Sequence, residues 1–203
     1  MKYGRGSIDF YNTISMVVID FEKAFLLLLI QQDAGAFNTF YLKTVDIFFR
    51  YLQSAYFLSQ AECEDIIADF YVKFRNAVVK YDIEQSFSAY VWTIFKNTVK
   101  DAFKKQKELP FSYLEYEEEE GESFEDCLVD ESDFSEFLQQ DFELEQIQKA
   151  MQELDVVSRE ILFLKYIEHK ENGEIEEILL ISQEVIRQRI SRALKKLRTL
   201  LNP

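Results

Sequence analysis

Near its C-terminus the chain reads Ser182-Gln-Glu-Val-Ile-Arg-Gln-Arg-Ile-Ser-Arg-Ala-Leu-Lys-Lys-Leu-Arg198. Ser182 can cap a helix, because its hydroxyl can accept a bond from a free backbone N–H of the first turn. Beyond it, apolar residues recur at steps of three and four and share one face: Ile186, Ile190, Ala193, Leu194, Leu197 and Leu201. The other side is polar and carries Glu184, Gln188, Ser191, Arg192 and Lys195, flanked by Arg187 and Arg189.

The predicted helix has two interpretations. From Val185 to the C-terminus there are six Lys/Arg and no Asp/Glu. A short helix that is half buried by leucines and half lined with Arg, Gln and Ser can lie in a DNA major groove. The same pattern fits a solvated amphipathic helix at the end of a bundle, since charged faces are usually only solvated. The sequence before it favours the first interpretation.

Composition predicts an all-α protein. The chain has 203 residues, 48% of them hydrophobic, with only five Gly and two Pro, and its apolar residues repeat at helical spacing. The two cysteines, Cys63 and Cys127, are far apart and predict free thiols in a reducing cytoplasm. The only histidine, His169, has no second metal ligand nearby. The apolar run Ala24 to Ile30 is too short to span a bilayer, and no signal peptide is visible.

The net charge of −14 is concentrated in one segment. Residues 111–146 hold fifteen Asp/Glu and no Lys or Arg, whereas the sequence on both sides is nearly neutral. Such dense like charge resists compaction and predicts a linker. A global negative charge can therefore hide local basic faces, and those faces decide whether a protein binds DNA.

Periodicity divides the chain into two small helical domains. Helices are predicted over residues 14–30, 37–52, 61–74, 87 to about 107, 147–154, 159–166, 174–179 and 182–198. Asp155 or Ser158 caps the helix over 159–166, and the last two helices have helix-turn-helix proportions. The predicted organisation is an N-terminal extension (1–22), a first domain (23–108), an acidic linker (109–143) and a helix-turn-helix domain (144–203).

The order of these pieces resembles the sigma-70 family of bacterial transcription initiation factors. The resemblance is to its small two-domain members of the extracytoplasmic-function type (group IV). Four stretches carry it: Asp33–Tyr41, Glu64–Phe74, Ser86–Asn97 with Asp101, Lys104 and Lys105, and the run from Leu154 through Arg159-Glu160, Glu174-Ile175 and Ile181-Ser182 to Arg192. In this order they are similar to the opening helix pair, the polymerase-binding helix, the promoter −10 helix and the −35 helix-turn-helix.

The resemblance implies protein partners. Asp65 and Asp69, on the outer face of their helix, would meet the basic clamp helices of core RNA polymerase, whose β and β′ subunits are the expected partners. Charge complementarity of this kind sets orientation and association rate. An anti-sigma factor or another recruiting factor is a further partner that the resemblance allows, whereas no membrane partner is expected. In the family, the acidic linker threads through the polymerase cleft.

The resemblance also implies two contacts with promoter DNA. Residues of the −10 contact and of strand opening would be Tyr81, Phe87, Tyr90, Trp92, Thr93, Lys96, Asn97, Lys100 and Lys104. Lysines would meet phosphates, and stacking of an unpaired base on an aromatic ring contributes roughly 1–3 kcal/mol. A helical wheel places Trp92 off the main apolar stripe, which leaves it for DNA. Residues of the −35 contact would be Glu184, Arg187, Gln188, Ser191, Arg192 and Lys195.

Several positions depart from the family pattern: Tyr90 stands where Trp is usual, the turn Glu168 to Gly173 is unusually acidic, and two residues of the helix-turn-helix differ. Leu180 stands in the helix-turn-helix turn where Gly is usual, and a left-handed backbone is unfavourable for Leu. Glu184 replaces a small residue at the start of the recognition helix.

The predicted function is a sigma factor that binds core polymerase, recognises −10 and −35 elements and assists melting. No nucleophile–base pair, phosphate-binding Gly loop or metal cluster is visible, so no enzyme, cofactor or metal is predicted. Two alternatives remain: a helix-turn-helix regulator that is not a polymerase subunit, and a helical protein-binding adaptor.

Overall fold

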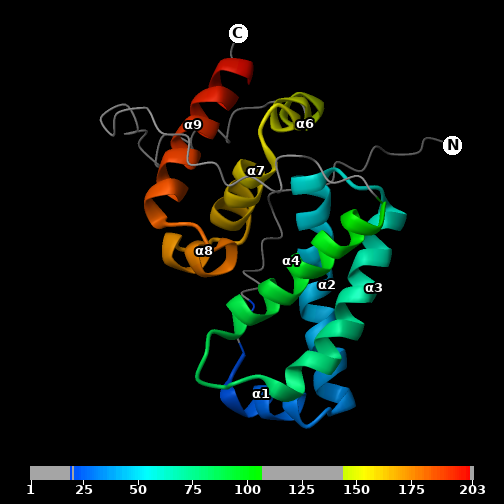
Figure 1. Cartoon of the computed structure of the whole chain (residues 1–203). Helices are drawn as coiled ribbons and strands as arrows, with labels where there is room; N and C mark the ends of the chain where they lie inside the picture. The colour runs from blue at the N-terminus through cyan, green and yellow to red at the C-terminus, as the bar shows by residue number, and fades with distance from the viewer. Residues whose placement is uncertain (1–18, 20, 107–143, 202–203) are drawn as a thin grey trace, which may run out of the picture.

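The computed structural model describes residues 19, 21–106 and 144–201, and every regular element in these ranges is helical, as predicted. The first domain contains α1 (Lys23–Ile30), α2 (Ala34–Tyr56), α3 (Gln60–Ala77), the turn η1 (Val78–Lys80) and α4 (Phe87–Gln106). The second contains α6 (Leu144–Gln152), α7 (Val156–Leu162), the π-helical turn η4 (Phe163–Ile167), α8 (Asn172–Leu179) and α9 (Gln183–Leu201) (Figure 1). The predicted N-terminal extension and acidic linker lie almost wholly outside the described residues.

The core of the first domain is built from aromatic rings. Helices α2, α3 and α4 lie side by side, and α1 crosses their far end (Figure 1). Phe40 stacks on Phe74 with ring centroids 4.4 Å apart, and Phe48 stacks on Phe95 at 4.2 Å. All four rings are fully buried. Aromatic pairs add about 0.5–1.5 kcal/mol beyond the burial of their area, so these rings fix how the three helices pack.

Local signals in the sequence set the helix starts in this domain. The Asp33 carboxylate accepts a bond from the backbone N–H of Ala36 at 2.8 Å and begins α2. Ser59 and Glu62 form a reciprocal capping box that begins α3. Such caps each stabilise a helix by about 1 kcal/mol. The predicted helix from residue 14 is wrong at residues 19, 21 and 22, because α1 begins only at Lys23; residues 14–18 and 20 lie outside the described ranges.

The second domain confirms both caps that the sequence suggested. Asp155 accepts from the backbone N–H of Ser158 at 2.9 Å, and the Ser182 hydroxyl accepts from that of Val185 at 3.4 Å. The apolar stripe of α9 is buried, apart from the half-exposed last residue: Ile186, Ile190, Ala193, Leu194, Leu197 and Leu201. Leu180 joins α8 to α9 with φ of 60°, in the left-handed region.

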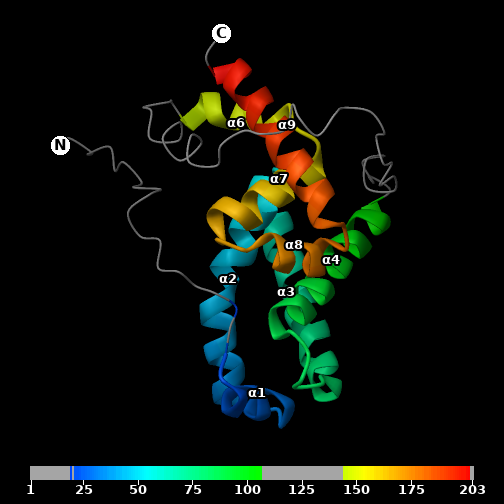
Figure 2. The same ribbon diagram turned by 90° about the vertical axis from the view of Figure 1, so that its left-hand side faces the viewer.

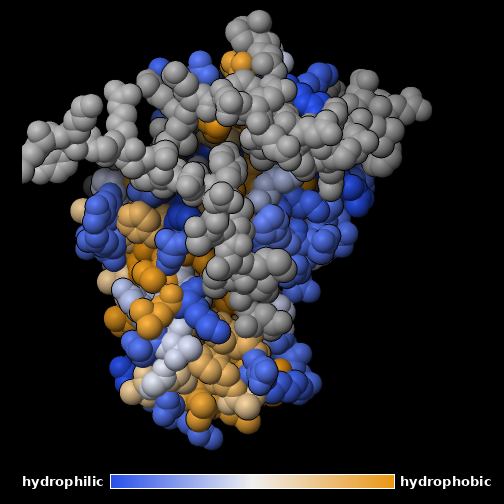
Figure 3. Space-filling view, turned by 180° about the vertical axis from the view of Figure 1, so that it is seen from behind, coloured by the Kyte–Doolittle hydropathy of each residue, from blue (hydrophilic) through white to orange (hydrophobic). Residues whose placement is uncertain are grey.

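The two domains pack against each other. Helix α7 lies on α2 and α8 lies on α4, and the turned view shows the second domain seated on the upper half of the first (Figure 2). Seen from behind, apolar side chains also reach the surface over the first domain (Figure 3). No helix in the described residues is long and apolar enough to cross a membrane.

Candidate nucleic-acid interface and domain contact

The two predicted polymerase-binding residues lie on the outside of α3. Asp65 and Asp69 are exposed, whereas Ile66 and Ile67 face the core. Val72 follows at the helical spacing that places it on the same face, and it is 64% exposed. Acidic and apolar side chains thus share one solvent-facing strip, which suits contact with another protein.

The outer face of α4 carries several predicted DNA contacts. Thr93, Asn97 and Lys104 are exposed and Lys100 is half-buried. Their spacing of three or four residues places them along one side of the helix. The Thr93 hydroxyl donates to the carbonyl of Ala89 at 2.8 Å, so it is held against its own helix.

The prediction that aromatic side chains of this region offer free rings is wrong for three of them. Trp92 is fully buried, and Phe87 and Tyr81 are each only 6% exposed. The Trp92 ring meets Phe48 and Tyr51 edge-on, with centroids 5.5 and 4.9 Å away. The helical wheel failed because α4 packs against α3 and α8 and its rings meet those of α2, so its apolar surface is wider than a single stripe.

Phe87 and Tyr81 fill the same aromatic core from the loop before α4. Their rings lie 5.3 Å apart, and the Tyr81 hydroxyl donates to the carbonyl of Gln85 at 2.5 Å. Tyr90 is half-buried, and its hydroxyl donates to the carbonyl of Ala77 at 2.8 Å. In this arrangement these side chains hold the loop in place.

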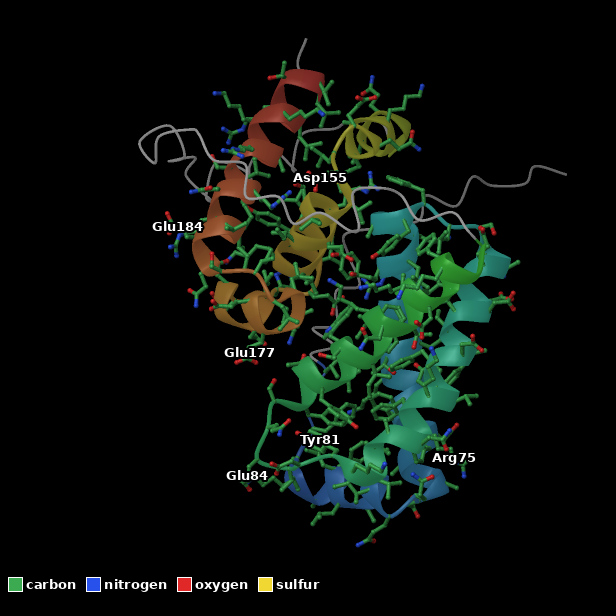
Figure 4. All side chains as sticks on the ribbon, in the orientation of Figure 1. Arg75, Tyr81, Glu84, Asp155, Glu177 and Glu184 are labelled. Atoms are coloured by element: carbon green, nitrogen blue, oxygen red, sulfur yellow. The ribbon has the colours of Figure 1, made fainter. Side chains whose placement is uncertain are left out.

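The polar face of α9 is mostly as predicted. Glu184, Arg187 and Lys195 are exposed, and Glu184 projects outward from the first turn (Figure 4). Gln188 and Arg192 are half-exposed. The prediction for Ser191 is wrong, because its side chain is only 5% exposed beside the apolar stripe. A small hydroxyl at this edge of the stripe fits the core without leaving a void.

A buried carboxylate that the sequence did not reveal joins the two domains. Glu160 of α7 is 1% exposed. Its Oε1 accepts bonds from the hydroxyls of Tyr51 and Tyr56, both at 2.5 Å, and its Oε2 lies 3.2 Å from Nζ of Lys96. These short, charge-assisted bonds are stronger than neutral ones. Lys96, predicted to be open to DNA phosphates, has a side chain only 15% exposed in this arrangement.

Arg159, next to this carboxylate, reaches across the domain contact as well. Its Nε donates to the carbonyl of Ala55 and its Nη1 to that of Leu154, both at 2.7 Å. Its guanidinium lies 4.9 Å from the ring of Phe57, which ends α2 in a left-handed conformation. One signal was available in the sequence: Arg159-Glu160 interrupts an otherwise apolar helix, and charges in such a position are almost always paired.

A second buried acid lies where η4 meets α2. The side chain of Glu168 is 5% exposed, and its Oε1 lies 3.8 Å from Nη2 of Arg50. Burial raises the pKa of Glu168 to about 7, although Arg50 and Lys170 act in the opposite direction and Asp46 adds to the rise. The described residues hold no group of acids, His or Cys arranged to bind a metal ion.

The architecture defines a class of protein before any comparison. It has a helix-turn-helix domain with a basic recognition helix and a second helical domain with lysines along α4, as DNA-binding proteins do. Residues 46–108 match sigma-70 region 2 and residues 144–197 match sigma-70 region 4, which together span more than half of the chain. The chain belongs to the sigma-70 family, and it is a sigma factor that directs promoter-specific transcription.

Solved structures agree on the fold. CnrH, solved in complex with the cytosolic domain of CnrY, is 18% identical with a TM-score of 0.62; the match covers 88% of this chain and 96% of that one. The sigma factor RpoE, solved with the anti-sigma factor NepR from Bartonella quintana, is 18% identical with a TM-score of 0.59 over 83% and 98% of the two chains. No curated protein sequence matches the chain. Sigma factors as a family regulate transcription and are not catalysts.

Proposed function

We propose that this chain is a sigma factor of the extracytoplasmic-function type, which acts in the bacterial cytosol. It binds core RNA polymerase through α3 and places α4 on the −10 element and α9 on the −35 element. The observation that carries the proposal is the pairing of two polar helix faces, on α4 and α9, within matches to regions 2 and 4 of one family. A helix-turn-helix regulator would leave the region 2 match without a role.

The polymerase contact rests on the strip of Asp65, Asp69 and Val72. The carboxylates steer a basic partner helix, and the exposed apolar side chain beside them gives buried area once the partner has docked. The β and β′ subunits of core polymerase supply such a helix in this family.

The −10 contact rests on the exposed side of α4. The Asn97 amide can donate and accept at a base edge, whereas Lys100 and Lys104, further along the helix, neutralise phosphates. We assign Thr93 to the sugar-phosphate backbone, since its hydroxyl already bonds its own helix.

The −35 contact rests on the first turns of α9. Arg187 and Gln188 can each make two bonds to a base edge, which is worth about 1–3 kcal/mol of discrimination. Glu184 can accept from a cytosine amine, and Arg192 and Lys195 follow further along the groove.

An anti-sigma factor is the regulatory partner that we propose. The two similar structures described above were each solved as a complex, one with the cytosolic domain of CnrY and one with the anti-sigma factor NepR. Their fold is shared by this chain, and its closed arrangement of the two domains is available for a third protein to stabilise.

Reconstitution with core polymerase on a promoter library tests the proposal, with 5′ ends of the RNA sequenced. Asp65→Lys with Asp69→Lys should abolish specific transcripts by weakening core binding, whereas Glu153→Lys, an exposed charge reversal in the second domain, should not. Asn97→Ala should change the preferred −10 sequence and Arg187→Ala the −35 sequence. DNA binding without polymerase, or no binding to either, would contradict the proposal.

A further inference from the structure

Three hydrogen-bond donors of the first domain converge on one point. Tyr51 and Tyr56 come from the last turns of α2, and Lys96 comes from the middle of α4. Their hydroxyls and ammonium hold both oxygens of the Glu160 carboxylate, at 2.5, 2.5 and 3.2 Å. We call these three residues the anion receptor. Two hydroxyls and an ammonium are donors that suit an oxygen anion, whether a carboxylate or a phosphate.

The anion receptor adjoins the polar face of α4. Lys96 lies four residues before Lys100 and next to Asn97, so its stem belongs to the same side of the helix. The edge of the surface proposed to face the −10 element therefore already contains a site shaped for one oxyanion. Glu160, which fills it, belongs to the other domain.

We propose that the anion receptor binds a backbone phosphate of promoter DNA, and that Glu160 is an internal competitor that occupies it while the domains are closed. This inference rests on the proposed function and adds Tyr51 and Tyr56 to its DNA contacts. In the closed protein α7 covers α2, Tyr51 is fully buried and the Lys96 side chain is nearly so. A phosphate can enter only after α7 leaves α2.

Two further contacts strengthen the closed arrangement without filling the receptor. Arg159 bonds the carbonyl of Ala55, and Arg50 faces Glu168. Replacing Glu160 therefore weakens closure while leaving these contacts in place, so the effects of the carboxylate can be measured separately. When the domains open, the Glu160 carboxylate and its donors form hydrogen bonds with water instead. These bonds offset part of the free energy that the closed contacts contribute, so closure is reversible.

The first test measures opening in the free, full-length protein by energy transfer between dyes on Val79→Cys and Leu200→Cys, two exposed positions in different domains. Cys127→Ser removes one native thiol, and Cys63 is left because burial raises its pKa to about 11 and so makes it unreactive. Glu160→Gln and Glu160→Ala should each lower the ratio of closed to open molecules by about tenfold or more. Glu153→Gln is the matched control. An unchanged ratio in both Glu160 variants would overturn the competitor role.

The second test measures affinity of the holoenzyme for a forked promoter DNA. Glu160→Gln should raise the affinity, because the competitor is weakened. In the Glu160→Gln background, Tyr56→Phe and Tyr51→Phe should each lower it several-fold, and Lys96→Gln should reduce the salt dependence by about one phosphate contact. If all three substitutions leave the DNA affinity unchanged, these side chains serve only the contact between the domains, and the phosphate site is overturned.

The two proposals fail in distinguishable ways. Opening is measured without polymerase or DNA, so it remains readable if wild-type protein directs no specific transcripts, which would refute the proposed function. The affinity for core polymerase, measured without DNA, should be the same for the Glu160→Gln variant and the Tyr56→Phe variant. Circular dichroism of each variant checks that the helices are intact.

Discussion

Replacing Glu168 with Gln should remove a pH dependence of stability. Glu168 lies at the domain contact with its side chain 5% exposed, and the charged groups around it are Asp46, Arg50 and Lys170. Burial is the largest influence and raises its pKa from 4.5 to about 7. An acid whose pKa is raised in the folded protein favours folding when protonated, and this stabilisation is lost as pH rises from about 4.5 to 7.

The magnitude follows from the size of the pKa change. Each pKa unit corresponds to about 1.36 kcal/mol, so the rise to about 7 makes the carboxylate form up to roughly 3 kcal/mol less favourable in the folded state. The pKa of about 7 for Glu168 already includes the attraction of Arg50 and Lys170, which lowers it. Glutamine keeps the shape of the protonated acid and has no charge to bury at any pH.

Urea denaturation at pH 5 and pH 8 measures this directly. The wild-type protein and Glu168→Gln should have similar free energies of unfolding at pH 5. At pH 8 the variant should be more stable by about 2–3 kcal/mol. Glu177→Gln, at an exposed acid on α8 (Figure 4), is the control for loss of one charge. An equal difference between variant and wild type at the two pH values would refute the reasoning.

Three further substitutions test features of the helices, all by urea denaturation. Leu180→Gly should stabilise the protein by about 1 kcal/mol, because Leu180 is left-handed and 83% exposed; Leu180→Ala keeps the backbone cost and should give no such gain. Asp155→Ala should lower the free energy of unfolding by about 1–2 kcal/mol, because the bond from the Ser158 N–H to the capping side chain is lost. Asp155→Asn should keep most of this capping stabilisation. Phe40→Ala should cost about 3–5 kcal/mol, and an effect below 1 kcal/mol would contradict its place against Phe74.

Features that depend only on residues close together in the chain could be predicted from the sequence. The caps at Ser182 and Asp155 follow from one side chain and the N–H groups three residues on, and the buried stripe of α9 follows from helical periodicity. The resemblance marked Leu180 as a departure where Gly is usual, and the backbone adopts the left-handed conformation there despite the larger side chain.

Contacts between distant parts of the chain could not be predicted in this way. Trp92 was assigned to DNA because a helical wheel assumes one buried face, whereas α4 has neighbours on several sides. Tyr51 and Glu160 are 109 positions apart, and no local pattern links them. Lys96 was predicted to lie on an exposed polar face, but its partner Glu160 comes from the other domain, and no local pattern predicts that burial.

The position of Trp92 also gives the molecule its own optical reporter. It is the only tryptophan in the chain, and its ring touches Tyr51, which in turn lies 5.3 Å from Phe163 of the second domain. A single ring thus separates the emitting group from the boundary between the domains. Stopped-flow fluorescence of the free, unlabelled protein after a small jump in urea concentration would follow the emission of this indole in time and give the rate at which the domains part.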